Sequence, residues 1–433
     1  MPTVVTEAQA LIQGDRAAAG RLAANLLQPL RDNFVARPWG GWTLREFKRL
    51  DGGADPGARI GEAFEIAADD MDMEAREHPS RIALADGSEL SLPALLEQYA
   101  ETLLGMEFVQ RYGRRFPLLP KTLDIAELLS VQGHPEGNTE AYVILAAEEG
   151  ATIRLGFAAD VDASALGARL AGGRLEQQRL LDLCGGTAAA GALQTLLKPW
   201  FAERAAPLDV LEGPVRALLR EPLRWPEAAG VLGGLRRLYW DVLDLMNAIP
   251  VRAGQVIYNA NPPRIVAASG KRASAEVHAL GNPEGREVLA LEVRLPGPTL
   301  RAWDNVRFPV REIDIAGALA ALNLRRTAPE EFIVAPRPVP GRPGVSRSVD
   351  SEYFRLEHLE PTALAAIEVP AAAPHCLHAL AGAVSVYATD GAVAGRLARG
   401  ESALVPLAVG AYRVVADSEP AALLKVDLPP YGS

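Results

Sequence analysis

Residues 116–157 read FPLLPKTLDIAELLSVQGHPEGNTEAYVILAAEEGATIRLGF, and this stretch decides the fold. Two apolar runs typical of strands flank a short segment that carries Gln132, His134 and Glu140. Because alternate residues of a strand point to the same face, Gln132 and His134 point the same way. Glu140 begins the next strand after a Pro/Gly turn, so a hairpin would return it to the same point. An amide oxygen, an imidazole and a carboxylate that converge predict a site for a borderline divalent metal.

Composition restricts the class of protein around this hairpin. The 433 residues are too many for one ordinary core, so we expect two or three domains. A hydrophobic content of 49% with 23% charged residues is typical of a soluble globular chain. Lys and Arg number 44 against 54 Asp and Glu, and the net charge of −10 argues against a general nucleic-acid surface. An anionic substrate would therefore need local basic residues.

The sequence also predicts where the protein works. No apolar stretch is long enough to span a bilayer, and the start MPTVVTEAQALIQGD lacks the basic and apolar regions of a signal peptide. Cys184 and Cys376 are too few and too far apart for a disulfide framework. We therefore expect a cytoplasmic protein without a membrane partner, acting as a monomer or a homodimer.

Local patterns predict the elements on either side of the hairpin. Apolar residues at helical spacing predict an amphipathic helix over 6–30 and another over 92–110. Strand-like runs occupy 39–50 and 63–67, and a further short helix is expected at 160–170.

The second half of the chain divides into three segments. Apolar residues recur every three or four positions over 171–246, which predicts a helical insertion. Strand patterns resume over 247–334, and the Pro-rich run APRPVPGRPG at 335–344 marks a linker. Beyond it, short strands predict a small antiparallel barrel or sandwich, at 377–380, 383–387, 402–406, 412–416 and 422–427.

The hairpin resembles the metal-binding hairpin of type I mannose-6-phosphate isomerases. That motif reads roughly PLLxKxLDAxxxLSVQVHPD and, after a loop, GKTExWYxLxAxPGAxIxxGF. Upstream, RPWGG at 37–41 and GEAFEI at 61–66 look like the family's WGG and GExWEIS elements. Downstream, EVHALG at 276–281 is similar to the segment that supplies a fourth metal ligand, and PTLRAWD at 298–304 to TTYRxYDW.

This resemblance implies a mainly β chain with a helical insertion. The cupin (jelly-roll) catalytic domain would combine residues 31–170, after an N-terminal helix over 1–30, with residues 247–334. The helical insertion would take 171–246, and a second, smaller and metal-free cupin-like β domain would take 345–433.

The resemblance also implies a ligand set of Gln132, His134, Glu140 and His278 around one Zn²⁺ per chain. The residue types alone would equally suit Mn, Fe or Co. A lone histidine on a strand is more often structural than a ligand, so the assignment of His278 depends on its motif. For Glu140 the alternative is a solvated carboxylate at a strand edge.

The same comparison gives roles to residues around the ligands. Arg301 matches an arginine assigned a catalytic role, and a guanidinium suits a developing oxyanion. The alternative is an ordinary surface arginine, or one in an ion pair with Asp304. Glu62 would orient the substrate or a metal-bound water. Lys121 is a candidate for phosphate binding or proton transfer, against the alternative of a strand-end cation, and Ser130 matches a serine near the substrate.

The chain departs from the family where the substrate would lie. Asn138 replaces the lysine of GKTE, and the loop between His134 and Glu140 is shorter than usual. The family's NSD is reduced to Pro-Gly-Pro at 296–298, and a longer, irregular segment precedes His278. These changes fit an altered substrate, or binding without turnover, as well as they fit the family's activity.

The remaining charged residues and histidines receive other interpretations. Glu65, in the GEAFEI element, is interpreted equally well as solvent-facing. His375 and His378 are three residues apart, which puts them on opposite faces of a strand, and we interpret both as structural. His78 and His358 lie in polar contexts and are expected at the surface.

The predicted function is a metal-dependent aldose–ketose isomerase that interconverts mannose 6-phosphate and fructose 6-phosphate through an enediolate. Its partner would be a small sugar phosphate. The alternatives are an isomerase of another sugar or sugar phosphate, a non-catalytic sugar-binding cupin, and a metal-dependent cupin oxygenase.

Overall fold

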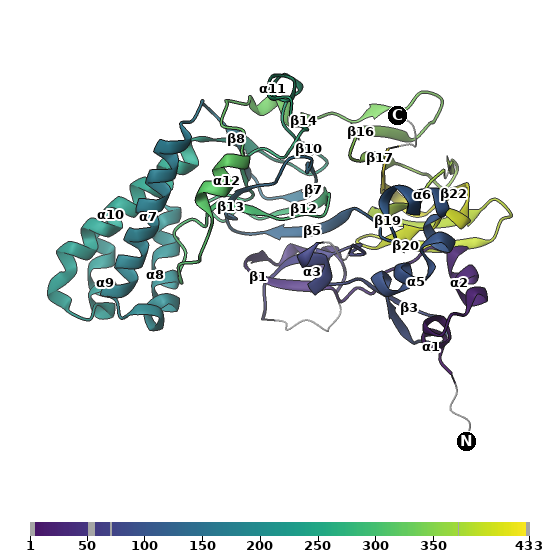
Figure 1. The fold of residues 1–433 in the computed structure, drawn as a ribbon, viewed down its shortest axis with the longest axis horizontal. Helices are drawn as coiled ribbons and strands as arrows, with labels where there is room; N and C mark the ends of the chain where they lie inside the picture. The colour runs from purple at the N-terminus through teal and green to yellow at the C-terminus, as the bar shows by residue number, and fades with distance from the viewer. Residues whose placement is uncertain (1–4, 51–56, 70–71, 371, 430–433) are drawn as a thin grey trace.

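Antiparallel sheets form the two β regions of the protein, and a lobe of helices extends from one end of it (Figure 1). The computed structural model describes residues 5–50, 57–69, 72–370 and 372–429. The extreme ends of the expected terminal segments, 1–4 and 430–433, lie outside the described residues.

Two sheets form a jelly-roll core in the middle of the molecule. The larger has the strand order β1-β2-β5-β12-β7-β10-β14 and the smaller β13-β6-β11-β8-β9. Ile144 and Val288 of the larger sheet meet Ile153 and Leu155 of the smaller one in a shared core. The strand bounds are β1 Phe34–Gly41, β2 Ile60–Phe64, β5 Leu119–Ile125, β6 Val131–Gly133, β7 Glu140–Ala147, β8 Thr152–Phe157, β9 Met246–Pro250, β10 Val256–Asn259, β11 His278–Ala279, β12 Val288–Arg294, β13 Leu300–Trp303 and β14 Ile333–Val334.

Four helices between β8 and β9 form the lobe at the left of Figure 1, where the sequence predicts an insertion. They are α7 Ala163–Leu183, α8 Ala190–Ala202, α9 Glu212–Leu218 and α10 Trp225–Asp244. The side chain of Asp162 accepts a hydrogen bond from the Ala165 amide and so fixes the start of α7. The short helix expected at 160–170 is therefore the first part of a 21-residue helix, and the boundary drawn at 171 falls inside it. Leucines of the lobe share one core with Trp303 of β13.

The N-terminal segment is not one helix over 6–30. It forms α1 Glu7–Ile12 and α2 Arg16–Ala23, because the Asp15 carboxylate caps the amides of Ala17 and Ala18 and starts a second helix. The chain then runs extended, and Leu27 forms an antiparallel bridge with Leu404.

Two other predicted elements are also divided. The helix expected over 92–110 breaks at Gly105, whose φ of +88° suits glycine, into α5 Leu92–Leu104 and α6 Met106–Tyr112. The strand expected over 39–50 ends at Gly41. The other short elements that follow β1 are α3 Thr43–Phe47, α4 Met73–Glu77, β3 Arg81–Ala83, β4 Glu89–Ser91, α11 Pro263–Ser269 and α12 Ile315–Ala321.

An eight-stranded antiparallel sheet forms the C-terminal region. Its order is β15-β16-β17-β22-β19-β20, with β18 on β22 and β21 on β19. The short strands expected at 377–387 and 412–427 are two long ones, because register shifts after Ala379 and Ala381 absorb the breaks in their pattern. The bounds are β15 Arg337–Pro338, β16 Val345–Asp350, β17 Arg355–Leu359, β18 Ile367–Val369, β19 His375–Ala388, β20 Val393–Ala398, β21 Ser402–Val405 and β22 Tyr412–Asp427.

Helices α1, α2 and α5 bury their apolar residues in a core that contains residues of both β regions. Leu11 and Leu96 lie in this core with Val293 of the larger sheet and with Leu424 of the C-terminal sheet. The two β regions are thus joined through a common hydrophobic core.

Within the described ranges, no single helix is long and apolar enough to cross a membrane. The helices over 163–183 and 186–202 reach that length and composition only as a pair, across a bend of 89°.

Candidate metal centre

Three neighbouring strands of the smaller sheet present side chains to one place. Gln132 of β6 lies opposite His278 of β11 on one side and opposite Arg301 of β13 on the other. Residues directly paired in an antiparallel sheet face the same side, so these three side chains share a face. Glu140 comes from the start of β7 in the larger sheet, and His134 follows β6 directly.

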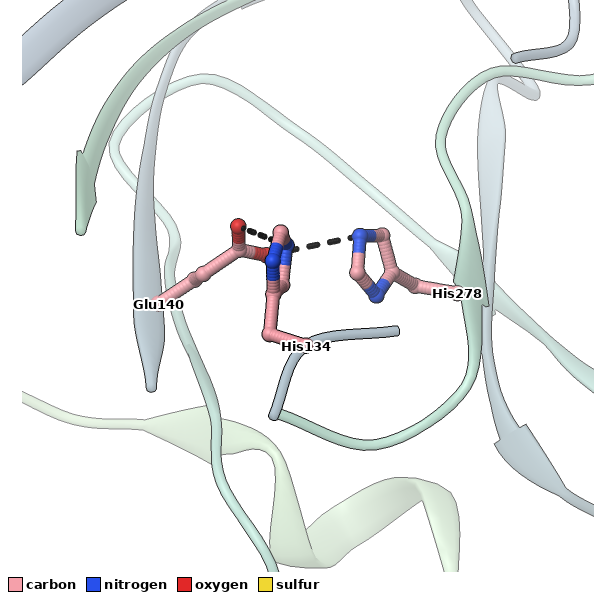
Figure 2. A group of neighbouring side chains, drawn as sticks. All are labelled: His134, Glu140 and His278. Carbon is pink, nitrogen blue, oxygen red and sulfur yellow. Dashed lines mark ion pairs between the residues drawn. The ribbon is translucent and has the colours of Figure 1, made fainter. Parts of the chain in front are cut away.

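His134, Glu140 and His278 meet in a buried cluster (Figure 2). The Nε2 atom of His134 lies 2.6 Å from Oε1 of Glu140, and Nε2 of His278 lies 3.4 Å from Oε2. One ligand atom from each residue can be chosen so that all lie within 4.8 Å of one another. The hairpin and the distant His278 therefore meet as the sequence predicts.

Polar groups contact the far side of each histidine ring. Nδ1 of His134 lies 3.1 Å from the carbonyl oxygen of Pro298, and Nδ1 of His278 lies 2.9 Å from that of Glu276. A carbonyl only accepts, so a neutral His134 ring carries its proton on Nδ1 and keeps a lone pair on Nε2. Nδ1 of His278 faces both the Glu276 carbonyl and the amide Nδ2 of Asn259, at 3.2 Å. Nε2 of His134 is buried and has no hydrogen-bond partner in the described part of the chain, although Oε1 of Glu140 is close. Two lone pairs that face each other in this way fit a cation.

The protonation states also suit a metal. Burial alone would raise the pKa of Glu140, but His134, His278 and Arg294 hold it well below its ordinary value. Burial lowers the pKa of His278. The hydroxyl of Tyr142 donates to Oε2 of Glu140 and orients the carboxylate. Ionised carboxylates and neutral imidazoles are the forms that bind zinc, so the residues present fit the group that the resemblance implies.

Gln132 is placed to be the fourth donor. Its Oε1 accepts a hydrogen bond from Ser130 Oγ at 2.9 Å, and its Nε2 lies 3.1 Å from Nε2 of His278. A half-turn of the amide would direct Oε1 into the cluster and let Nε2 donate to Ser130. Ser130 therefore contacts a candidate ligand directly.

The cluster opens into a cavity of about 140 Å³ with a strongly charged wall. The side chains that line it include Arg37, Trp39, Glu62, Glu74, Lys121, Ser130, Gln132, His134, Glu140, Glu292, Arg294, Arg301, Asp304, Arg307 and Arg311. All eight predicted site residues except His278 are among them.

Arg301 lies at this cavity without a carboxylate partner among the described residues. The alternative interpretation, an ion pair with Asp304, is wrong: that carboxylate pairs with Arg307 at 3.3 Å and Arg311 at 2.9 Å. Arg301 is half-buried on β13, directly opposite Gln132, so its guanidinium is available to an anionic group in the cavity.

Lys121 is not a strand-end cation but the centre of a buried ion cluster. Its Nζ lies 3.2 Å from Glu292, 3.3 Å from Glu74 and 3.8 Å from Glu62. Burial would lower the pKa of Lys121, but these carboxylates, led by Glu292, raise it above its ordinary value. Glu62 is in turn held by Arg37 at 2.6 Å. Lys121 therefore remains protonated.

Sequence reasoning assigned no role to Glu74, Glu292 or Arg294. Glu292 and Arg294 are two apart in the apolar strand VLALEVR, so they share a face, and both are buried. Two charges on one face of an apolar strand are a signal that could have been used. Glu74 follows no comparable pattern, and it reaches Lys121 from α4.

Glu65 and the other histidines lie outside the cluster. Glu65 is buried, with Lys48 at 2.7 Å, so the solvent-facing interpretation is wrong. His78 stacks on Phe64 and His358 contacts Ser348 at 2.8 Å, and both are half-buried.

Comparison with known proteins agrees with this geometry. Residues 36–151 match the family model for the catalytic domain of type I phosphomannose isomerase. A stretch of 138 residues is 31% identical to the Putative mannose-6-phosphate isomerase YvyI of Bacillus subtilis (strain 168), covering 29% of this chain and 39% of that protein. The predicted resemblance to type I phosphomannose isomerases is confirmed, and the match spans well under half of that relative.

Solved structures extend the likeness of fold to nearly the whole chain. The mannose 6-phosphate isomerase from Bacillus subtilis aligns with a TM-score of 0.60 at 18% identity, over 93% of this chain and 100% of its own. A variant of the phosphomannose isomerase from Salmonella typhimurium gives 0.59 at 18%, over 93% and 99%. A mannose 6-phosphate isomerase bound with zinc and yttrium gives 0.58 at 18%, over 94% and 100%. The mainly β cupin fold with a helical insertion is thereby confirmed.

Proposed function

We propose that this protein is a metal-dependent aldose–ketose isomerase whose first candidate substrate is mannose 6-phosphate, with fructose 6-phosphate as product. One observation carries the proposal. Two imidazole nitrogens and a carboxylate converge in a buried cluster beside a charged cavity, and the buried Nε2 of His134 has no hydrogen-bond partner among the described residues. The match of residues 36–151 to the isomerase catalytic domain supports the choice of reaction.

Gln132, His134, Glu140 and His278 would hold one Zn²⁺. When bound, the metal supplies a Lewis acid that polarises the sugar's carbonyl oxygen. Arg301, on the strand beside Gln132, would bind the negative oxygen that develops as the proton leaves carbon. The guanidinium of Arg301 can bind this oxygen without first breaking an ion pair, because no carboxylate among the described residues is paired with it.

The proton transfer between C1 and C2 needs a base in the same cavity. Lys121 does not suit this role, because its carboxylate neighbours keep it protonated. Glu292 suits it better: burial raises the pKa of this carboxyl, which brings it nearer to neutrality, and the residue lines the cavity. We assign Lys121 and Glu62 the role of fixing this wall, Lys121 through Glu292 and Glu62 through Arg37.

One observation favours a second candidate, the isomerisation of another sugar or sugar phosphate. The amide of Asn138, where the resembled family has a lysine, donates to the carbonyl of Leu295 and is not among the residues that line the cavity. Position 138 therefore contributes no positive charge to the cavity. A substrate that carries a different charge from mannose 6-phosphate would fit the replacement of lysine by asparagine. We place either reaction in the cytoplasm, in keeping with two buried free cysteines.

A coupled assay of zinc-loaded protein with mannose 6-phosphate, following fructose 6-phosphate, tests the proposal. We expect turnover that is lost in His134→Ala and kept in His358→Ala, a matched histidine outside the cluster. Turnover of other aldoses with mannose 6-phosphate inert would select the second candidate. If zinc-loaded protein acts on no member of an aldose and aldose-phosphate panel, the enzyme assignment fails, and sugar binding alone would indicate a non-catalytic cupin. Oxygen uptake by iron-loaded protein would instead indicate the oxygenase.

A further inference from the structure

The turn between β12 and β13, residues Leu295 to Pro298, has few backbone hydrogen-bond donors of its own. Its sequence Leu-Pro-Gly-Pro contains two prolines, which lack amide hydrogens, so only Leu295 and Gly297 have donors. The Gly297 amide donates to Oδ2 of Asp72 at 2.7 Å. The carbonyl groups of the turn must therefore find partners among side chains.

Two side chains converge on those carbonyls. Nδ2 of Asn138 donates to the Leu295 oxygen at 3.1 Å, and Nη1 of Arg294 donates to the same oxygen at 3.0 Å. The same Nη1 lies 3.2 Å from the oxygen of Gly297. A Cβ on Gly297 would lie 3.0 Å from Nδ2 of Asn138, so the amide packs directly on the turn.

The last carbonyl of the turn contacts the metal cluster. The oxygen of Pro298 accepts the Nδ1 proton of His134 at 3.1 Å, and this leaves Nε2 of His134 for a metal. We infer that Asn138 and Arg294 are positioning residues that hold the turn 295–298, and through Pro298 they keep His134 in the tautomer that binds metal. The inference rests on the proposed function insofar as His134 is a ligand there.

Arg294 is itself anchored on the other side. Its Nη2 lies 3.2 Å from Glu74 and its Nη1 3.4 Å from Asp72, and only 2% of the side chain is exposed. Asp72 also caps α4 through the amides of Glu74 and Ala75. A lysine in place of Arg294 would keep the charge but could not reach two carbonyls and two carboxylates at once.

This assignment gives Asn138 a task that a lysine could not perform in the same way. The short amide reaches Leu295 from the loop between the two ligands His134 and Glu140, and so ties that loop to the turn. Supporting groups behind metal ligands typically change metal affinity by about 10–100-fold when removed.

The test uses the full-length protein, with ¹⁵N-labelled histidine for the tautomer and competition with a chelator for zinc affinity. In the metal-free wild type we expect the proton of His134 on Nδ1. Asn138→Ala and Arg294→Lys should each weaken zinc binding by about tenfold and should mix the tautomers of His134. The matched control is Asn247→Ala, a buried amide that donates to the carbonyls of Leu155, Gly156 and Thr327.

The control should lower the melting temperature without changing zinc affinity. A wild type with the His134 proton on Nε2 overturns the inference, and this measurement needs no variant to fold. Zinc affinity unchanged in both folded variants overturns it as well. The protein could isomerise no sugar phosphate and still carry the His134 proton on Nδ1, with zinc affinity reduced in both variants. That result would refute the proposed function and leave the inference standing.

Discussion

The two β regions each bury two histidines. The two sets differ in the groups that their ring nitrogens contact. His134 and His278 lie far apart in sequence and converge on Glu140. His375 and His378 are neighbours on β19 but use their ring nitrogens separately, His375 on Tyr412 at 2.7 Å and His378 on Ser402 at 2.8 Å. Convergence, not proximity in sequence, distinguishes the candidate metal centre.

The largest effect should come from removing a candidate ligand. His134→Ala should reduce bound zinc from one per chain to none, with affinity lower by more than about 100-fold, because a first ligand matters more than its supports. His378→Ala should keep one zinc. Elemental analysis after dialysis measures both, and a metal-free His378→Ala beside a metal-loaded His134→Ala would reverse the comparison.

Arg301→Ala should separate metal binding from turnover. We expect kcat to fall by about 10²–10³-fold, the usual loss when a donor to a developing oxyanion is removed, while one zinc stays bound. Arg325→Ala, an arginine paired with Asp160 on the surface, is the control. Unchanged kcat would remove Arg301 from the mechanism.

The two regions should respond to pH in opposite directions. In the region of the candidate metal centre, burial beside Glu287 raises the pKa of Asp124 to about 8. A folded-state pKa above the unfolded value means that stability is complete below about pH 4 and falls as pH rises toward 8, at roughly 1.4 kcal/mol per pH unit at most.

Asp124→Asn should remove this slope, since an amide mimics the protonated acid and can still accept from the Leu44 amide. Urea unfolding at pH 5 and pH 8 measures the effect. We expect the variant to gain stability over the wild type at pH 8 more than at pH 5, and an equal difference at both would contradict the raised pKa of Asp124.

In the C-terminal region the dependence of stability on pH has the opposite sign, and we expect it to be smaller. Burial lowers the pKa of His375 to about 3, below its unfolded value, so its contribution is present above about pH 6.5 and is lost as pH falls. His375→Gln, which keeps a polar partner for Tyr412, should flatten the loss of stability between pH 6.5 and 4 in thermal melts. A steeper acid loss in this variant would show that His375 is not the titrating group.

The sequence predicts most reliably what is local. Gln132, His134 and Glu140 are close enough in the chain for strand alternation to bring them together, whereas His278 was found only through its motif. The surroundings of Lys121 escaped prediction because Glu74 and Glu292 come from α4 and β12, which no local pattern connects. Helix ends were missed where a single cap decided them, as at Asp15 and Gly105.

The distance between Gln132 and His278 along the chain bears on how the protein is made. The two residues pair directly across β6 and β11, yet 146 positions separate them. During synthesis the hairpin leaves the ribosome long before His278 is translated, and the whole helical lobe is made in between. The nascent hairpin therefore has only part of its donor set, and a complete site can form only after the lobe has emerged and β11 has docked beside β6. Tight metal binding would then show that the two sheets of the jelly-roll core have assembled.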